Sequence, residues 1–352
     1  MHPYHKNKKG HVYWKSCSML LIGLLLTIIL LVPALIVAPH TGTSTKVKTS
    51  TEKTTEKTAE TAETVTLSSE DSAFTVEVMR SETDQIEKVL LEDYVTRVVA
   101  SEMPAEFELE ALKAQALAAR TYIVNYLAHV KDDAANVTDT IQHQVYKNDE
   151  ELRKVWGSDY SWKISKIKQA VAGTVGEILT YEEQPITPAF FSTSNGYTEN
   201  SEDYWENALP YLKSVASPWD QDSPKFLDQK IIPINQVEEA LGVTLSQAST
   251  AFNMIRTESN RVETVEIAGQ TFTGRDIREA LDLRSSDFDI EQKNDHLIFT
   301  TKGYGHGIGM SQYGANGMAK DGKNYQDIVT YYYQGTEIER IEDATPTLVV
   351  KN

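Results

Sequence analysis

The sequence is poor in cysteine and short of basic residues. Its 352 residues include one cysteine, Cys17, so the chain can form neither an intrachain disulfide nor a cluster of metal-bound thiolates. Lysine and arginine number 34 against 51 aspartates and glutamates, which gives a formal net charge of -17. So acidic a chain repels polyanions, which argues against nucleic acid as a partner. Hydrophobic residues still make up 40% of the chain, enough for a sizeable core.

Charge is unevenly distributed near the N-terminus. Residues 1–18 carry lysines and no acid, and the 20 residues 19–38 carry no charge at all. A run of this length matches the roughly 30 Å hydrocarbon core of a bilayer, so we predict a single transmembrane anchor there. The positive flank predicts a cytoplasmic N-terminus and an extracytoplasmic body. A cleaved signal peptide ending near Ala38 is the alternative, although signals usually have only roughly 7–15 apolar residues.

Residues 39–69 lack the apolar side chains that a folded segment needs. Thr, Lys, Glu, Ala and Ser dominate, with eleven threonines. Such a composition cannot bury enough apolar area to offset chain entropy, so we predict a disordered tether. The remaining body, 70–352, holds 47 of the acidic and 26 of the basic residues, for a net charge of -21. Its lack of cysteine favours a Gram-positive-type exterior over a disulfide-forming compartment.

Helix-like and strand-like segments are interspersed through the body. A helix over 90–102 is expected to stop at Pro104, and the Ala-, Leu- and Lys-rich stretch 108–130 predicts a long helix. Further helices are expected at 164–172, 235–241, 273–281 and 325–333, and strands at 74–78, 177–181, 189–192, 262–267, 297–300 and 348–350. The order lacks βαβ regularity, which favours an α+β fold over a doubly wound sheet.

Glu102, in the run Ser-Glu-Met-Pro, is the first candidate site residue. It stands at the expected C-terminal end of a helix, where the helix dipole disfavours a negative charge. Its apolar neighbours could desolvate the carboxyl and raise its pKa toward the range of a general acid. An exposed carboxylate without a function is the alternative.

The long helix carries a second group of candidates. Residues seven apart lie on nearly the same helical face, which pairs Lys113 with Arg120 and Gln115 with Tyr122. These side chains could orient an anionic or polar ligand. A solvated stripe without a ligand is the alternative.

Two polar or glycine-rich segments complete the candidates. In 190–198, two phenylalanines lead into hydroxyl and amide side chains, including Ser192 and Asn195, a pattern that can present hydrogen bonds to sugars but also fits an ordinary turn. No G-x-S-x-G motif is present there, which disfavours a hydrolase serine. The segment 303–314 has five glycines in twelve residues around His306, so we expect close backbone approach or positive φ there.

Taken together, these segments resemble the stage II sporulation protein D family, which includes the amidase-enhancer proteins. The stretches that carry the resemblance are YVTRVVASEMP (94–104), EALKAQALAARTY (110–122), AFFSTSNGYT (189–198) and GYGHGIGMSQYGANGMA (303–319). They follow one another in the family's order, and the resemblance spans about residues 70–340.

The resemblance implies a lytic transglycosylase that acts on peptidoglycan, with one body domain over 70–352 forming two lobes around a substrate cleft. Glu102 falls on the family's catalytic acid. The expected substrate-binding residues are Lys113, Gln115, Arg120, Tyr122, Ser192, Asn195, His306, Ser311 and Gln312. Some relatives bind zinc through a histidine and two cysteines in the stretch equivalent to 139–146. Only His143 remains here, so we predict no metal and no cofactor.

The same resemblance implies a cellular setting. The expected substrate is a peptidoglycan glycan strand, preferably one stripped of its stem peptides, cleaved during septal thinning and engulfment in sporulation. The expected partners are a companion amidase-type hydrolase and an integral-membrane scaffold protein, and the expected location is the mother-cell side of the engulfing septum. A non-catalytic wall-binding enhancer of an amidase is the alternative.

Overall fold

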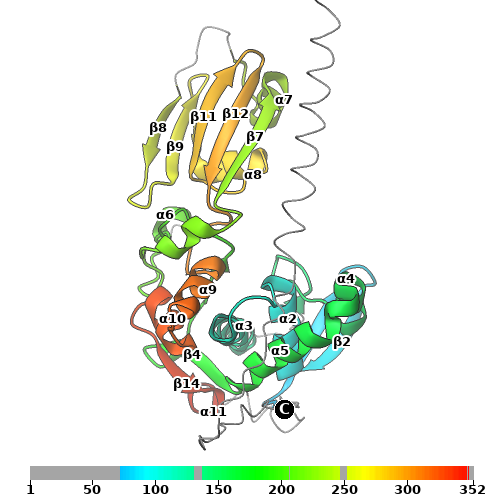
Figure 1. The fold of residues 1–352 in the computed structure, drawn as a ribbon. Helices are drawn as coiled ribbons and strands as arrows, with labels where there is room; N and C mark the ends of the chain where they lie inside the picture. Colours follow the sequence, from blue (N-terminus) through cyan, green and yellow to red (C-terminus); the bar gives the residue numbers. More distant parts are fainter. Residues whose placement is uncertain (1–71, 131–136, 206, 246–251, 347, 349–352) are drawn as a thin grey trace, which may run out of the picture. The chain divides into compact units, whose positions relative to one another are not determined.

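The computed structural model describes residues 72–130, 137–205, 207–245, 252–346 and 348 (Figure 1). All of them belong to one compact unit, 62–352. The predicted anchor at 19–38 and the predicted tether at 39–69 lie outside the described residues. No helix within the described ranges is long and apolar enough to cross a membrane.

The first part of the unit is built around a long helix. A hairpin of β1 (Thr75–Arg80) and β2 (Gln85–Leu90) leads into α2 (Leu91–Glu102), and β3 (Val137–Thr138) pairs parallel to β1. Pro104 follows the end of α2, and α3 (Leu109–His129) begins five residues later. α4 (Asp149–Trp156) and α5 (Tyr160–Ala172) follow, and α2, α3 and α5 pack together over one apolar core.

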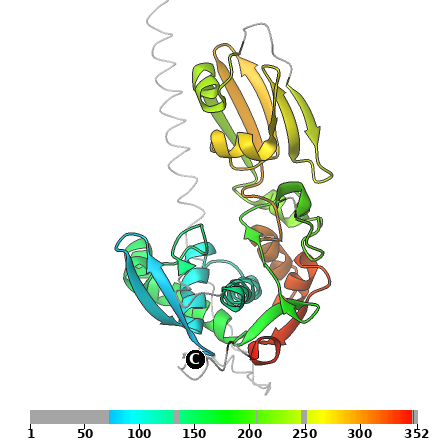
Figure 2. The ribbon, with the colours of Figure 1, turned by 180° about the vertical axis from the view of Figure 1, so that it is seen from behind.

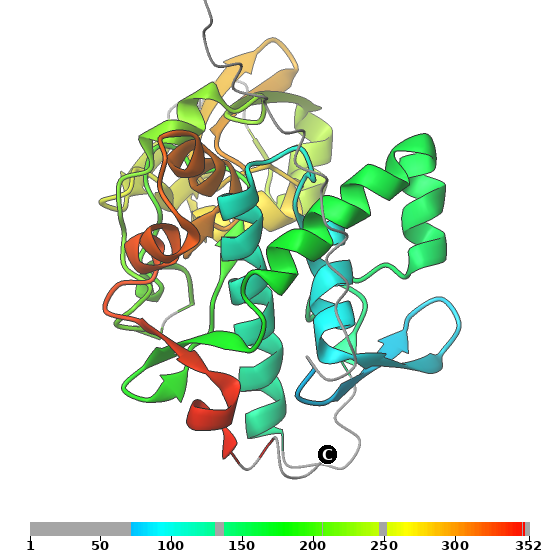
Figure 3. The same cartoon turned by 60° about the horizontal axis from the view of Figure 1, so that its bottom comes forward.

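The opposite side of α3 packs on elements from the C-terminal part of the chain (Figure 3). These are α9 (Gln312–Lys320) and α10 (Tyr325–Tyr332), and β4 (Glu177–Tyr181) and β5 (Gln184–Pro185) also contact α3. The remaining elements outside residues 227–302 are β6 (Phe190–Phe191), α6 (Glu202–Trp205), a 3-10 helix (Pro218–Asp222), β13 (Met310–Ser311), β14 (Glu337–Arg340) and α11 (Ile341–Ala344). β4 lies between β14 and β5, and β13 pairs parallel to β6. A second apolar core joins α3, α9 and α10.

A third apolar core lies within residues 227–302, which form the β-rich region in Figure 2. Its elements are β7 (Leu227–Pro233), α7 (Ile234–Leu241), β8 (Asn253–Arg256), β9 (Val262–Ile267), β10 (Gln270–Thr273), α8 (Gly274–Ala280), β11 (Phe288–Lys293) and β12 (His296–Lys302). They form two antiparallel sheets of three strands, ordered β10-β9-β8 and β11-β12-β7.

The α+β class is confirmed, and the two principal helices end within one residue of the expected bounds. The expected strand at 348–350 is described only at Leu348, which is helical, while residues 349–350 lie outside the description.

The helix α9 was not predicted, because Gly314 and Gly317 disfavour a helix locally. A Cβ on Gly314 would lie 2.1 Å from the Tyr332 hydroxyl, and one on Gly317 would lie 2.3 Å from Cβ of Trp219. Tertiary packing therefore requires glycine in this helix.

Candidate functional site

Glu102 is the last residue of α2, and its side chain is half-buried. The next residue, Met103, is buried with an extended backbone, so the chain leaves the helix at this carboxyl. Burial raises the pKa of Glu102 above its ordinary value, while the N–H of Val145 and the charge of Lys147 act in the opposite direction. The Val145 N–H donates to Glu102 Oε1 at 2.9 Å. Glu102 is therefore a carboxyl that keeps its proton to higher pH than usual and has a donor in place for the ionised form.

Aromatic and amide contacts hold the Val145 segment against α2. The Tyr94 hydroxyl donates to Gln144 Oε1 at 3.2 Å, and the Tyr94 ring stacks on Tyr146 at 5.7 Å between centroids. Arg97 Nη1 donates to the Tyr146 hydroxyl at 2.7 Å. Tyr94 and Arg97 lie one turn apart on α2, so the helix that carries Glu102 also positions the backbone N–H that faces it.

Two glutamines join Glu102 to the other helices. Gln312, the first residue of α9, donates from Nε2 to the Glu102 carbonyl at 3.0 Å and to Gln115 Oε1 at 3.4 Å. Gln115 is fully buried, and its Nε2 is without a partner in the described structure. The C-terminal end of α2 and the N-terminal end of α9 are therefore joined to each other and to Gln115 of α3 through the amide of Gln312.

Tyr122 lies two turns beyond Gln115 on α3. It is half-buried and stacks on Tyr126 at 6.5 Å, and the Tyr126 ring meets His143 edge-on at 4.9 Å. The sequence interpretation omitted Tyr126 and Tyr94. Tyr126 lies four residues after Tyr122, and this helical spacing could have predicted that the two rings are neighbours on α3.

The stretch 139–146 does not fit a zinc site. His143 Nδ1 accepts the N–H of Thr138 at 3.1 Å, and Asp139 is committed to Arg80 at 3.0 Å and to the N–H of Ser81 at 3.1 Å. In the described part of the chain, no three His, Cys, Asp or Glu side chains are grouped so that they could hold a metal ion. The stretch 139–146 reads DTIQHQVY, with His143 and no cysteine.

Lys113 and Arg120 are not brought to Glu102. Lys113 Nζ lies 2.7 Å from Glu110 Oε1 and 5.6 Å from the ring of Tyr325, which places it on the side of α3 that faces α10.

Arg120 is fully buried and forms two bonds to Glu92, at 2.6 and 2.9 Å. Its remaining hydrogen bonds go to Thr174 and to the carbonyls of Val171 and Glu177. The expectation of a substrate contact at Arg120 is therefore corrected to a core ion pair, because its donors are used within the protein.

Asn195 and Ser311 lie in a second polar network. Asn195 Nδ2 donates to Asp287 Oδ2 and to the Ser259 carbonyl, both at 2.7 Å. Ser311 is buried, caps α9 and donates to Asp220 Oδ1 at 2.5 Å. Asp220, which the sequence interpretation missed, is also buried and accepts from Ser194 and Ser217. This network joins loops that are far apart in sequence, so its polar groups are occupied within the protein.

His306 lies among aromatic rings, with Phe191 at 5.7 Å, Trp205 at 5.8 Å and Tyr204 at 6.0 Å. Burial lowers the pKa of His306 to about 4, and its Nδ1 accepts the N–H of Ile308 at 3.0 Å. The ring is therefore neutral at pH 7 and has a packing role in this structure.

The expectation of close backbone approach in the glycine-rich segment is confirmed. At Gly309, φ is +77° and a Cβ would lie 2.0 Å from the Ala189 carbonyl oxygen.

Ser192 is half-buried and borders the Glu102 group. Its carbonyl accepts the N–H of Tyr313 at 3.1 Å, and its hydroxyl lies 3.4 Å from Lys225 Nζ. Of the predicted substrate-binding residues, Gln312 contacts the backbone carbonyl of Glu102, and Gln115 is joined to it through Gln312. Ser192 is joined to the same segment through the Tyr313 N–H.

The chain is similar in sequence to known proteins. A family model described as Stage II sporulation protein matches residues 79–181, the range that includes Glu102. The chain is 51% identical over 279 residues to the Stage II sporulation protein D of Bacillus amyloliquefaciens, which covers 77% of this chain and 80% of that protein. The protein of the same name from Bacillus subtilis is 51% identical over 278 residues, with the same shares covered. The Amidase enhancer of Bacillus subtilis is 30% identical over 296 residues, covering 68% of this chain and 39% of the relative. The chain therefore belongs to the stage II sporulation protein D family.

Proposed function

We propose that this protein is a lytic transglycosylase that cleaves the β-1,4 bond between N-acetylmuramic acid and N-acetylglucosamine in peptidoglycan. The observation that carries the proposal is the state of Glu102, a half-buried carboxyl whose pKa is raised by burial. The neighbouring acids Glu92 and Glu106 are ion-paired, with Arg120 and Lys163 respectively. Among the described residues no basic side chain forms an ion pair with Glu102, and its carboxyl accepts the N–H of Val145.

The reaction requires only one carboxyl. Most glycosidases use two, one as an acid and one as a base or nucleophile. In a lytic transglycosylase the substrate supplies the nucleophile. Protonated Glu102 donates its proton to the glycosidic oxygen, and the C1–O bond breaks. The resulting carboxylate then removes the proton of the muramoyl C6 hydroxyl as that oxygen bonds to C1, which leaves a 1,6-anhydro end and consumes no water.

The contacts of Glu102 suit both halves of this cycle. Desolvation raises the pKa of Glu102 and so favours the protonated carboxyl for the first transfer, and the Val145 N–H at 2.9 Å stabilises the carboxylate formed by it. Gln312 fixes the backbone of Glu102 through a bond of 3.0 Å. General acid–base catalysis of this kind contributes roughly 10²–10⁴ in rate. Binding of the oxocarbenium-like sugar has to contribute the remainder.

The proposal includes a setting in the cell. The uncharged run 19–38 is proposed to anchor the protein in the membrane with its N-terminus in the cytoplasm. The body would then act outside, on the mother-cell side of the engulfing septum during sporulation. An acidic body is repelled by walls that carry anionic stem peptides, so we propose that it acts on strands stripped by a companion amidase-type hydrolase, beside an integral-membrane scaffold protein.

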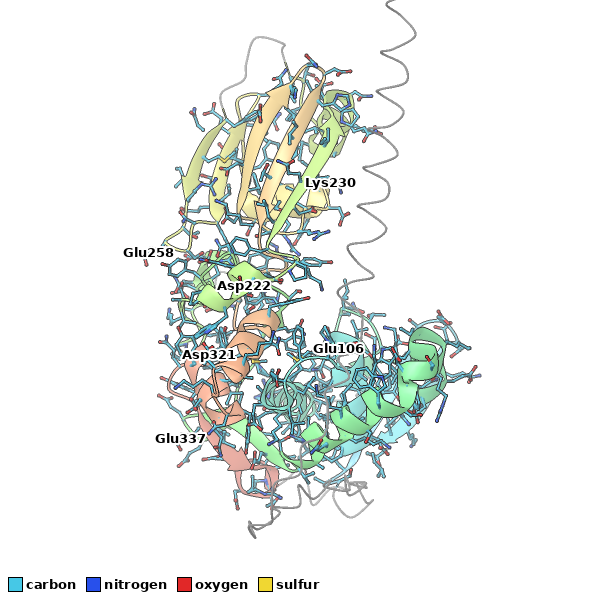
Figure 4. All side chains as sticks on the ribbon, in the orientation of Figure 1. Glu106, Asp222, Lys230, Glu258, Asp321 and Glu337 are labelled. Atoms are coloured by element: carbon cyan, nitrogen blue, oxygen red, sulfur yellow. The ribbon has the colours of Figure 1, made fainter. Side chains whose placement is uncertain are left out.

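The test is the variant Glu102→Gln, which keeps an acceptor for Val145 but cannot donate a proton. Purified full chain is incubated with amidase-treated sacculi, and the products are analysed by mass spectrometry for 1,6-anhydro-muramic ends. We expect wild type to form these ends and Glu102→Gln to lose the activity. The control is Glu106→Gln, whose carboxylate is 57% exposed and is labelled in Figure 4. Wild-type rates in Glu102→Gln would refute the assignment.

A non-catalytic enhancer of an amidase is the second candidate function. It is favoured by the 30% identity to the Amidase enhancer of Bacillus subtilis. Such a protein would raise the release of stem peptides by an added amidase without forming anhydro ends itself. Product analysis with and without the amidase separates the two functions.

A further inference from the structure

A half-buried lysine without an acidic partner lies beside the Glu102 site. Lys225 stands between the 3-10 helix 218–222 and β7. Its Nζ lies 3.4 Å from the Ser192 hydroxyl, and within the described ranges no carboxylate is within ion-pair distance of it. Burial and the nearby charge of Arg284 both lower the pKa of Lys225, which shows that its positive charge is poorly compensated.

Several other lysines of the body are paired with acids, whereas Lys147, Lys166 and Lys168 are, like Lys225, half-buried without a carboxylate at ion-pair distance among the described residues. Three other partly buried lysines each bind a glutamate: Lys113 with Glu110, Lys163 with Glu106 and Lys213 with Glu202. Even the more exposed Lys230, labelled in Figure 4, is 3.2 Å from Asp282. In a body with a net charge of -21, an unpaired lysine leaves an anion-binding position open.

Aromatic rings and a second cation surround Lys225. Its Nζ lies 5.4 Å from the ring centroid of Tyr304 and 5.7 Å from that of Tyr313. Arg284 lies over the same Tyr304 ring at 5.5 Å, and its other contact is with Asp228 at 3.3 Å. Tyr304 is 40% exposed, so its ring is accessible. Aromatic faces pack on sugar rings and cations bind carboxylates, so together they suit an anionic saccharide.

A chain of contacts joins this cluster to the candidate acid. Tyr313 follows Gln312, whose amide binds the carbonyl of Glu102 at 3.0 Å. The Tyr313 N–H binds the carbonyl of Ser192, and its ring meets Phe107 edge-on at 4.9 Å. The Lys225 cluster is therefore connected, through Ser192 and Tyr313, to the segment that carries Glu102.

We propose that Lys225, with Arg284, Tyr304 and Tyr313, binds the lactyl carboxylate of N-acetylmuramic acid in strands that carry no stem peptide. The inference rests on the proposed function and deepens it. While a stem peptide is attached, the lactyl carboxyl is a neutral amide. Its hydrolysis creates a carboxylate on every second sugar, which a lysine and an arginine can distinguish from the amide. Lys225 would thus select strands on which an amidase has already acted.

Binding is measured with the full chain carrying Glu102→Gln, so that no strand is cleaved. The ligands are peptide-free glycan strands, the same strands with the lactyl carboxyl converted to a methylamide, and strands that keep their stem peptides. We expect Lys225→Gln to weaken binding to peptide-free strands about tenfold, as for one charge-assisted hydrogen bond at a half-buried site, and to leave binding to methylamide strands unchanged. The matched control Lys320→Gln removes the same charge at an exposed position on α9 and should change neither.

Two results would overturn the inference. Equal weakening on free and methylamide strands would show that Lys225 supports the sugar site without recognising the carboxylate. Weakening confined to peptide-bearing strands would assign the anion to stem-peptide carboxylates instead. Lys225→Arg, which keeps the charge, should retain the discrimination, and equal urea midpoints would exclude a folding defect. Because binding is measured without turnover, a failure here is distinguishable from a lack of anhydro products.

Discussion

The buried pair Arg120–Glu92 distinguishes a structural role for this arginine from a substrate-binding one. Arg120 on α3 and Glu92 on α2 are 0% and 1% exposed, and two hydrogen bonds of 2.6 and 2.9 Å join them. Arg120 also donates to the carbonyls of Val171 and Glu177. Removing one member of such a pair leaves a buried charge uncompensated, at a cost of about 3–5 kcal/mol. We expect Arg120→Met to lower the free energy of unfolding by that amount.

The assay is urea denaturation of the full chain, followed by fluorescence, beside product analysis at a temperature where the variant stays folded. Lys113→Met is the matched control on the same helix, because its pair with Glu110 is partly exposed and contributes about 0–1 kcal/mol. The double variant Arg120→Met/Glu92→Leu should recover most of the loss, since both charges are then gone. An Arg120→Met protein that unfolds like wild type yet forms no anhydro ends would refute the structural assignment.

Two further predictions concern Glu102 and Gly309. Because burial raises the folded-state pKa of Glu102, the folded protein keeps a proton that the unfolded chain releases, so stability falls as pH rises from the ordinary glutamate value through the raised one. Glu102→Gln should therefore unfold at higher urea than wild type at pH 7 and at the same urea at pH 4; a constant difference would contradict this. Gly309→Ala should lower the free energy of unfolding by about 3 kcal/mol, because the positive φ costs about 1–2 kcal/mol and the added Cβ would overlap the Ala189 carbonyl. At Gly322 φ is +84° and a Cβ would have no neighbour within 4 Å, so Gly322→Ala should cost only the roughly 1–2 kcal/mol of the positive φ. Equal urea midpoints for Gly309→Ala and Gly322→Ala would count against the packing argument.

Local signals were sufficient for the helices α2 and α3. Pro104 ends α2 where expected, and the candidate residues Gln115 and Tyr122 both lie on α3. The seven-residue spacing did not bring Lys113 and Arg120 together, since Lys113 pairs with Glu110 and Arg120 with Glu92. α3 is buried on nearly all sides, so its polar residues could not be assigned to solvent or core from periodicity.

Other features depend on partners that are remote in sequence. The Ser311 hydroxyl donates a hydrogen bond to Asp220, 91 residues away, and the Asn195 amide donates one to Asp287, 92 residues away. No local pattern distinguishes a hydroxyl or amide that such a partner occupies from one that is free for a ligand. The same holds for Lys225, where the informative observation is the lack of a carboxylate among its described neighbours in space.

The contacts of the stretch 139–146 explain how it is held in place without a zinc ligand set. Asp139 is bound by Arg80, Gln144 by Tyr94 and Tyr146 by Arg97, so side chains from β1 and α2 hold both ends and the middle. Between them, Val145 directs its N–H at Glu102. The geometry of the acid therefore depends on hydrogen bonds within the protein. It follows that a chelator should leave the positioning of Glu102 intact, whereas loss of the Tyr94 hydroxyl should disturb it.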